Sequence, residues 1–182
     1  METEDTKPNN QLTGLCGEHY VSALLAGYGL VVALPRGGAA RSDLFVGNSD
    51  RGRALRVQVK SGRQSYWKYK RKYEGRAGYS WDTSRSIIDT HDERHWYAFV
   101  SLGKWPVDAT APVVFFAPSD FVATRLKQDS GEKRPFFWGF EADLEPYRGH
   151  AGVTLLKAAI GKTCQSPASL LATAKPDMNS LS

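Results

Sequence analysis

Cysteine is scarce in this chain, with Cys16 and Cys164 the two examples among 182 residues. The small secreted folds that depend on disulfides need a set of closely spaced cysteines, so the sequence excludes that class. Cys16 and His19 have half of a zinc-binding spacing, but no second half follows, which argues against a structural zinc site. We therefore expect a reducing, cytoplasmic setting.

Long apolar runs are also missing, and no stretch of the sequence is long enough to cross a bilayer. The start of the chain lacks the pattern of a signal peptide, so we expect no membrane partner. A length of 182 residues allows one domain with a substantial core. We expect this domain over residues 12–161, with flexible tails over residues 1–11 and 162–182, which hold few large apolar side chains.

The net charge is small, at +5, but its distribution is uneven. Residues 63–85 hold seven basic and two acidic side chains, an excess equal to the net charge of the whole chain. Six aromatic residues share this segment, and Lys68, Lys70 and Lys72 alternate with several of them. This alternation predicts a strand with a cationic and an aromatic face, turned into a hairpin at residues 75–78.

A basic aromatic hairpin suits nucleic acid, because its cations would neutralise phosphates. Its aromatic side chains would either pack the hairpin onto the core or stack on unpaired bases. A solvated basic loop is the alternative interpretation. Two arginines in the glycine-rich loop of residues 35–41 could also touch phosphates. The residues that we expect to contact DNA are Arg36, Arg41, Arg63, Lys68, Lys70, Arg71 and Lys72.

The polar pattern of two successive segments is the most specific signal in the sequence. Residues 54–61 alternate between apolar side chains (Leu55, Val57, Val59) and polar ones (Arg56, Gln58, Lys60), as a strand with one buried face does. Turn-forming residues separate this strand from another over 42–47. A hairpin centred near residues 50 and 51 pairs residues whose numbers add to about 101, which places Asp43 opposite Gln58.

A carboxylate, an amide oxygen and an ammonium would then converge at Asp43, Gln58 and Lys60. Oxygen ligands of this kind hold a hard cation such as Mg²⁺, which polarises a phosphate and lowers the pKa of a bound water. A lysine can offset the negative charge that develops on the phosphate. The pattern predicts metal-dependent hydrolysis of phosphodiester bonds.

A fourth candidate lies on an amphipathic helix predicted over residues 14–28, where Glu18 falls at the edge of the apolar stripe. A carboxylate there either reaches across the end of the sheet or is solvated at the rim. Further strands are expected over residues 30–34, 95–102, 113–117 and 136–140. Helices are expected over 120–128, capped by Ser119, and over 152–160.

The order of these motifs resembles the PD-(D/E)XK nuclease superfamily. The matching residues are Gly17, Glu18, Val21, Leu24 and Leu25 on the helix, Asp43 on the second strand, and Gln58, Val59, Lys60, Ser61 and Gly62 on the third. Within it the chain is most similar to the small stand-alone branch that includes the cyanobacterial group I intron homing endonuclease. The match covers residues 14–62, and extends more weakly to about 160.

The resemblance implies an α/β fold with a restriction-endonuclease-like αβββαβ core, that is, a mixed central sheet flanked by helices, here with the basic aromatic hairpin as an insertion. It also implies DNA cleavage with Mg²⁺, for which Mn²⁺ could substitute. By position, Glu18, Asp43 and Gln58 would be metal ligands and Lys60 the catalytic lysine. Double-strand cleavage would need a homodimer or a higher homo-oligomer.

The sequence departs from the family at two positions. Ser42 replaces the family's proline, which only shapes the strand entry. Gln58 replaces an acidic residue, so the site has two carboxylates and we expect weaker metal binding; glutamine also occurs here in the intron-endonuclease branch. We therefore expect a Mg²⁺-dependent endodeoxyribonuclease. The alternatives are an inactive nuclease-fold DNA-binding module, an enzyme similar to Holliday junction resolvases, and a protein-interaction module using the aromatic hairpin.

Overall fold

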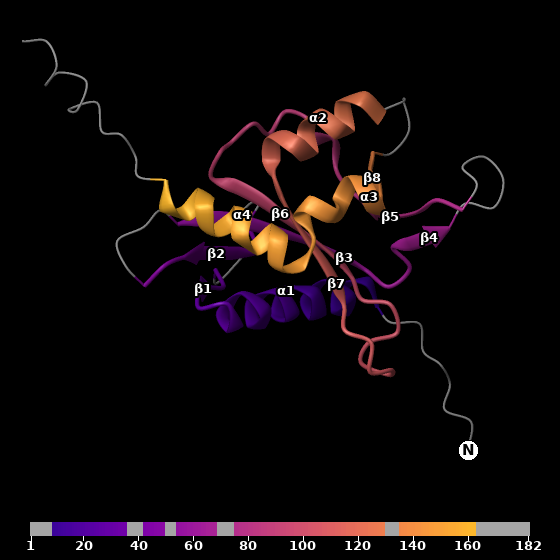
Figure 1. The fold of residues 1–182 in the computed structure, drawn as a ribbon, viewed down its shortest axis with the longest axis horizontal. Helices are drawn as coiled ribbons and strands as arrows, with labels where there is room; N and C mark the ends of the chain where they lie inside the picture. Colours follow the sequence, from indigo (N-terminus) through magenta and orange to yellow (C-terminus); the bar gives the residue numbers. More distant parts are fainter. Residues whose placement is uncertain (1–8, 36–41, 50–53, 69–74, 130–134, 163–182) are drawn as a thin grey trace, which may run out of the picture.

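The computed structural model describes residues 9–35, 42–49, 54–68, 75–129 and 135–162, and these form two sheets with helices on both sides (Figure 1). The larger sheet has five strands in the order β1-β2-β3-β6-β7. Their bounds are Val31–Ala33, Leu44–Gly47, Leu55–Gly62, His95–Ser101 and Val113–Pro118. β3 and β6 run parallel and the other neighbours run antiparallel, so the sheet is mixed.

The smaller sheet has the order β4-β5-β8 and is antiparallel throughout. β4 (Tyr66–Lys68) and β5 (Ala77–Asp82) form the hairpin predicted within residues 63–85. The predicted turn lies too late, because β5 already begins at Ala77; residues 69–74 lie outside the described residues. β8 (Phe136–Phe140) completes this sheet from a distant part of the sequence.

Four helices cover the sheets. α1 (Asn10–Gly27) and α4 (Gly149–Gly161) pack on one face of the larger sheet, and α2 (Ser119–Asp129) packs on β6 and β7 from the other. The short α3 (Glu141–Leu144) follows β8, and the 3-10 turns η1 (Arg85–Ile87) and η2 (Glu145–Tyr147) complete the order. The predicted fold class, a mixed central sheet flanked by helices, is confirmed.

Two boundaries differ from the prediction at the ends of the domain. α1 includes Asn10 and Gln11, which the sequence assigns to the tail, because the Asn9 side chain accepts a hydrogen bond from Gln11 N at 2.9 Å and caps the helix. α4 begins at Gly149, whose φ of 47° suits glycine. The rest of the predicted tails, residues 1–8 and 163–182, lies outside the described residues. Within those ranges, none of the helices has the length and apolarity needed to cross a membrane.

Ser119 does not cap α2, contrary to the prediction. Its hydroxyl donates to Asp92 O at 2.7 Å and accepts from Asp92 N at 3.0 Å. The serine is buried, so the side chain satisfies the backbone of the loop that precedes β6 instead of the helix end. Ser119 thereby fixes α2 to the entry of β6.

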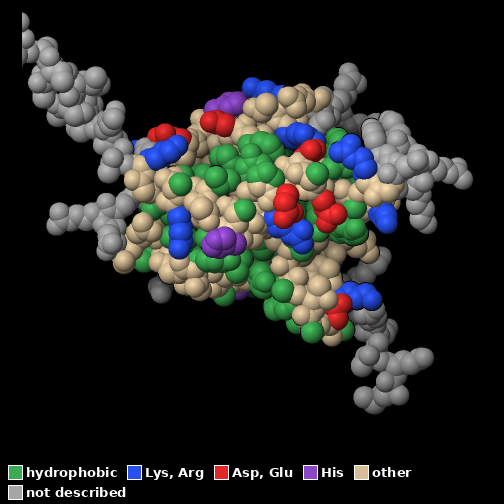
Figure 2. Space-filling view, viewed as in Figure 1, with side chains coloured by type: hydrophobic (Ala, Val, Ile, Leu, Met, Phe, Trp, Pro, Cys, Tyr) green, Lys and Arg blue, Asp and Glu red, His purple; other side chains and the backbone are tan. Residues whose placement is uncertain are grey.

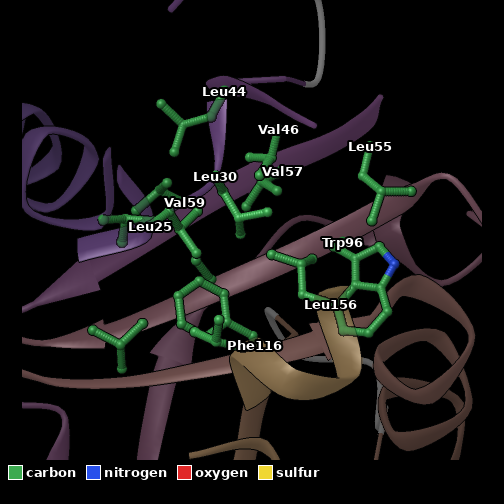
Figure 3. Close-up of a cluster of buried hydrophobic side chains, with 14 of the residues drawn as sticks. Leu25, Leu30, Leu44, Val46, Leu55, Val57, Val59, Trp96, Phe116 and Leu156 are labelled. Atoms are coloured by element: carbon green, nitrogen blue, oxygen red, sulfur yellow. The ribbon is translucent and has the colours of Figure 1, made fainter. Parts of the chain in front are cut away.

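The alternation of side chains along β3 and β6 divides the core in two. Val57, Val59 and Trp96 point to the α1 and α4 side, where they join the cluster shown in Figure 3. Tyr97 and Phe99 point to the α2 side and pack with the second cluster, which includes Tyr79, Trp81, Phe115 and Phe137. The hairpin aromatics Tyr79 and Trp81 therefore pack the insertion onto the core.

Gly17 sets how closely α1 approaches β3. It is buried, and a Cβ at this position would lie 2.5 Å from Ser61 Cβ and 2.6 Å from Ser61 Oγ. Ser61 Oγ donates to Thr13 O at 3.0 Å, so the same side chain that fills the space beside Gly17 also binds the helix backbone. Glycine is required here by close approach and not by backbone conformation.

We predict opposite effects for two glycine substitutions in α1. Gly17→Ala should lower the free energy of unfolding by about 1–3 kcal/mol, because the methyl group overlaps Ser61. Gly14→Ala meets nothing within 4 Å and should raise that free energy by about 0.5–1 kcal/mol through helix propensity. Urea unfolding of both variants provides the measurement. Equal effects would show that the helix can move away from β3 without cost.

Candidate functional site

The register between β2 and β3 brings the start of β2, where Asp43 lies, beside Gln58 and Lys60 of β3. Leu44 pairs with Val57, Phe45 with Arg56 and Val46 with Leu55, so the paired numbers add to 101 as predicted. Asp43 precedes β2, and its N donates to Val57 O at 3.0 Å, one residue off the register of the strand pair. Since Val57 and Val59 are buried on the other face, Gln58 and Lys60 point to the α2 side of the sheet, and Asp43, Gln58 and Lys60 are all half-buried.

The Asp43 carboxylate is fixed by the backbone of β3. Its Oδ2 accepts a hydrogen bond from Val59 N at 2.7 Å. The main chain of Asp43 therefore binds Val57 and its side chain binds Val59. These two hydrogen bonds join the start of β2 to β3. This hydrogen bond orients the carboxylate through Oδ2 alone. The other carboxylate oxygen, Oδ1, does not take part in the bond. A carboxylate that is held in one orientation can bind a ligand without first losing conformational freedom.

Glu18 is electrostatically coupled to Asp43 across the end of the sheet. Burial raises the pKa of Glu18 above its usual value, the negative charge of Asp43 raises that pKa further, and His19 opposes both effects. α1 packs on the face of β3 opposite Gln58 and Lys60, and Glu18 is half-buried, as expected for a residue at the margin of the apolar stripe. Two carboxylates under mutual repulsion favour a cation between them.

A cleft of about 620 Å³ begins at Lys60. It runs between the start of α1, the end of β3 and the smaller sheet, and its lining residues are Asn10, Thr13, Lys60, Ser61, Gly62, Arg63, Gln64, Ser65, Ser80, Trp81, Asp82 and Phe136. Lys60 and Arg63 are its cations and Asp82 its carboxylate. Arg63 is held in place because its Nη1 donates to Trp105 O at 2.8 Å. Lys60 therefore belongs both to the polar face of β3 and to an open groove.

Arg56, the preceding polar residue on this face of β3, has a structural partner. Its guanidinium forms an ion pair with Asp92. The pKa of Asp92 is lowered, first by the hydrogen bond from Arg94 N at 2.8 Å and also by the charge of Arg56, against an opposing effect of burial. Arg56 is thus engaged in holding the loop before β6.

The predicted DNA-binding residues are only partly within the described ranges. Lys68 is exposed on β4, and Arg63 lines the cleft. Arg36, Arg41, Lys70, Arg71 and Lys72 lie outside the described residues. On the face formed by α1, α2 and α4, basic and acidic side chains of the described residues lie beside one another and form no continuous patch of one sign (Figure 2).

Two features of the site do not follow from the sequence. No sequence pattern joins β8 to the hairpin, although aromatic residues recur at every second position in Phe136, Trp138 and Phe140. The first turn of α1 also lines the cleft, through Asn10 and Thr13, whereas the sequence predicts a later start for this helix. Among the described residues, no group of three or more His, Cys, Asp or Glu side chains is placed to hold a metal ion.

The raised pKa of Glu18 generates a prediction about stability. Because the folded chain holds the Glu18 proton more tightly than the unfolded chain, the free energy of unfolding falls as the pH rises from below the ordinary glutamate pKa of about 4.3 through the raised value. Glu18→Gln removes this fall and should make the protein more stable than the wild type at neutral pH. Urea unfolding at acidic and neutral pH measures the effect.

The matched control for this experiment is Glu93→Gln, which changes an exposed glutamate before β6. It should leave the pH dependence of unfolding as in the wild type. A Glu18→Gln variant with the same pH dependence as the wild type would contradict the raised pKa of Glu18.

Comparisons with known proteins give structural similarity alone. No family model and no curated protein matches the chain. The fold is similar to that of the bacterial homing endonuclease I-Ssp6803I, with a TM-score of 0.48 and 20% identity over 83% of this chain and 96% of that one. It is also similar to Hjc, a Holliday junction resolvase from the archaeal hyperthermophile Archaeoglobus fulgidus, with a TM-score of 0.42 and 15% identity over 77% of this chain and 93% of the other.

Proposed function

We propose that this protein is a metal-dependent endonuclease that hydrolyses phosphodiester bonds in DNA. The proposal is supported by three observations: Gln58 and Lys60 share the polar face of β3, the Asp43 carboxylate is bound to Val59 N between them, and the Asp43 charge acts on Glu18. A structural role alone explains Asp43, which closes a strand ladder. It does not explain why a second carboxylate is held beside Asp43 at an electrostatic cost.

The donor set suits a divalent cation. Asp43 and Glu18 supply carboxylate oxygens, and Gln58 supplies an amide oxygen, which are the ligands that Mg²⁺ and Mn²⁺ take in proteins. When bound, such an ion polarises the phosphate and lowers the pKa of a water molecule. Two carboxylates supply less negative charge than three, so the affinity for the metal ion should be modest. Mg²⁺ and Mn²⁺ are both candidates.

Lys60 is the residue of this face that reaches the cleft. A substrate phosphate in the cleft would meet the Lys60 ammonium next to the oxygen ligands, where the cation offsets negative charge on the reacting phosphate. Arg63 lies further along the cleft and would neutralise a neighbouring phosphate. One such site cuts one strand, so a double-strand cutter would act as a homodimer or a higher oligomer.

One residue favours a second candidate function. Gln58 lacks the negative charge of a carboxylate, and a protein with this substitution could bind DNA without cutting it. The rival is therefore a nuclease-fold DNA-binding module. A junction-specific enzyme is a subclass of the first proposal and differs from it only in substrate.

Cleavage of plasmid DNA tests the proposal. The purified protein should nick or linearise plasmid in Mg²⁺ or Mn²⁺ and stop when EDTA removes the metal. Asp43→Asn and Lys60→Ala should each lower the rate by about a hundredfold or more, because each removes a group that acts on the reacting phosphate. Asp89→Asn and Lys104→Ala, both at exposed positions, are the matched controls and should cut normally.

The two candidate functions differ in the outcome of these assays. DNA binding without cleavage in either metal would support the inactive module. Gln58→Glu adds a charged ligand, so it should tighten metal binding measured by calorimetry and lower the metal concentration needed for cleavage. An unchanged metal dependence would contradict a role for Gln58 at the ion.

The basic hairpin gives an independent prediction about affinity. If Lys68, Lys70 and Lys72 contact phosphates, replacing all three with alanine should weaken duplex binding to all sequences alike. The slope of log affinity against log salt should fall by about 0.9 for each phosphate that is no longer neutralised. Fluorescence anisotropy over a range of salt concentrations measures both. An unchanged slope would place the DNA path elsewhere.

A further inference from the structure

One face of the smaller sheet is turned away from both cores and carries aromatic rings. Tyr79, Trp81 and Phe137 point into the second core. Because side chains alternate along strands, the opposite face carries Trp67 from β4, Gly78 and Ser80 from β5, and Trp138 and Phe140 from β8. We call this set the outer aromatic face. Figure 1 shows β4, β5 and β8 toward one end of the long axis, with β1 and β2 toward the other.

The outer aromatic face is built around small residues. A Cβ at Gly78 would lie 2.7 Å from two ring atoms of Trp67, so the indole lies against the bare backbone of β5. The ring centroid of Trp67 is 6.3 Å from that of Trp138 and 5.8 Å from that of Phe140. Trp138 and Phe140 are 5.5 Å apart at an interplanar angle of 87°. Glycine and serine leave room between large rings.

A pocket of about 400 Å³ opens on this face. Its lining residues are Trp67, Lys68, Ser80, Phe136 and Trp138. Three of these are aromatic, and the Phe136 side chain is 48% exposed. The size falls within the usual range of about 300–1,000 Å³ for small-molecule sites. An exposed pocket with aromatic walls and a few polar groups suits a flat ring that carries hydrogen-bonding groups.

Cations surround the rings. The guanidinium of Arg76 lies 3.5 Å from the centroid of the Phe140 ring, and that of Arg125 lies 5.2 Å from the Trp138 ring. Arg125 also forms an ion pair with Asp143 at 3.4 Å, which offsets part of its charge. Guanidinium groups over the rings of this face favour a ligand with an aromatic part and a negative part.

The pocket neighbours the cleft that begins at Lys60. Ser80 and Phe136 line both. A ligand with aromatic groups in the pocket would therefore extend past Arg63 toward Lys60. Asp82 lines the cleft near this junction and would repel a phosphate there, so the backbone must pass on the Arg63 side.

We propose that the outer aromatic face binds unpaired bases of a DNA strand whose phosphates run along the cleft to Lys60. The inference rests on the proposed nuclease function, which supplies the cleft with its substrate. In a duplex the base faces are stacked and closed to Trp67 and Trp138, whereas unpaired bases can stack on them. The substrate class is then DNA with a single-stranded segment beside the scissile phosphate, such as a flap, gap or branch.

Binding of single-stranded DNA in EDTA tests the proposal without cleavage. Trp67→Leu and Trp138→Leu keep apolar packing but remove the stacking surface, and each should weaken the binding of a single-stranded oligonucleotide by about tenfold or more. Trp138→Phe should restore most of the affinity. Duplex affinity should change little. Circular dichroism and thermal unfolding establish that each variant folds.

Tyr66→Leu is the matched control. Tyr66 is the neighbour of Trp67 on β4 and is 50% exposed, but it pairs with Tyr79 and contacts that ring on the opposite face of the sheet. This variant should bind single strands as the wild type does. Unchanged single-strand affinity in both tryptophan variants, or an equal loss in Tyr66→Leu, would overturn the proposal. So would tryptophan variants that alter only self-association in sedimentation, because the occupant would then be a second copy of the chain.

The two proposals fail separately. Tryptophan-dependent binding of single strands by a protein that never cuts DNA would retain this inference and overturn the nuclease. Metal-dependent cleavage that requires Asp43, together with single-strand binding that does not depend on Trp67 or Trp138, would retain the nuclease and overturn this inference. If both hold, a gapped or branched substrate should be cut faster than intact duplex, and Trp67→Leu should abolish that preference while leaving duplex cleavage unchanged.

Discussion

The close approach of α1 to β3 is the constraint on which the candidate site depends. Gly17 leaves no side chain between the two elements, and Ser61 fills that space and binds Thr13 O. Glu18 follows Gly17 directly, so its distance from the sheet is set by the same contact. A helix that stood further off would relax the repulsion between Glu18 and Asp43.

This arrangement stores an electrostatic cost within the fold. Burial and the Asp43 charge both disfavour an ionised Glu18. The hydrogen bond from Val59 N to Asp43 Oδ2 fixes one carboxylate, so the pair cannot simply separate. A neutral side chain at position 18 would remove this cost. The repulsion would vanish on binding a cation, which links folding stability to metal binding.

Much of the larger sheet could be predicted because its signals are local. Alternation along residues 55–60 specifies the two faces of β3, and the turn before it specifies the register in which Leu44 pairs with Val57. The roles of these residues at a metal stay predictions. The smaller sheet could not be assembled from sequence, because β8 joins β5 across more than fifty residues and no local rule specifies that pairing. The wrong assignment of Ser119 has a similar cause: its partner, Asp92, is distant in sequence.

The alternation of side chains along β5 and β8 separates the residues that anchor the hairpin from those that face outward. In β5, Tyr79 and Trp81 enter the core while Gly78 and Ser80 face outward, so the residues that anchor the hairpin cannot also bind a ligand. β8 repeats the division, with Phe137 inside and Trp138 outside. The hydrophobic contacts of the inner side make the outer rings a rigid surface, and rigid rings lose little conformational entropy on stacking. A hairpin anchored on one side and open on the other is therefore better suited to holding unpaired bases than a solvated basic loop.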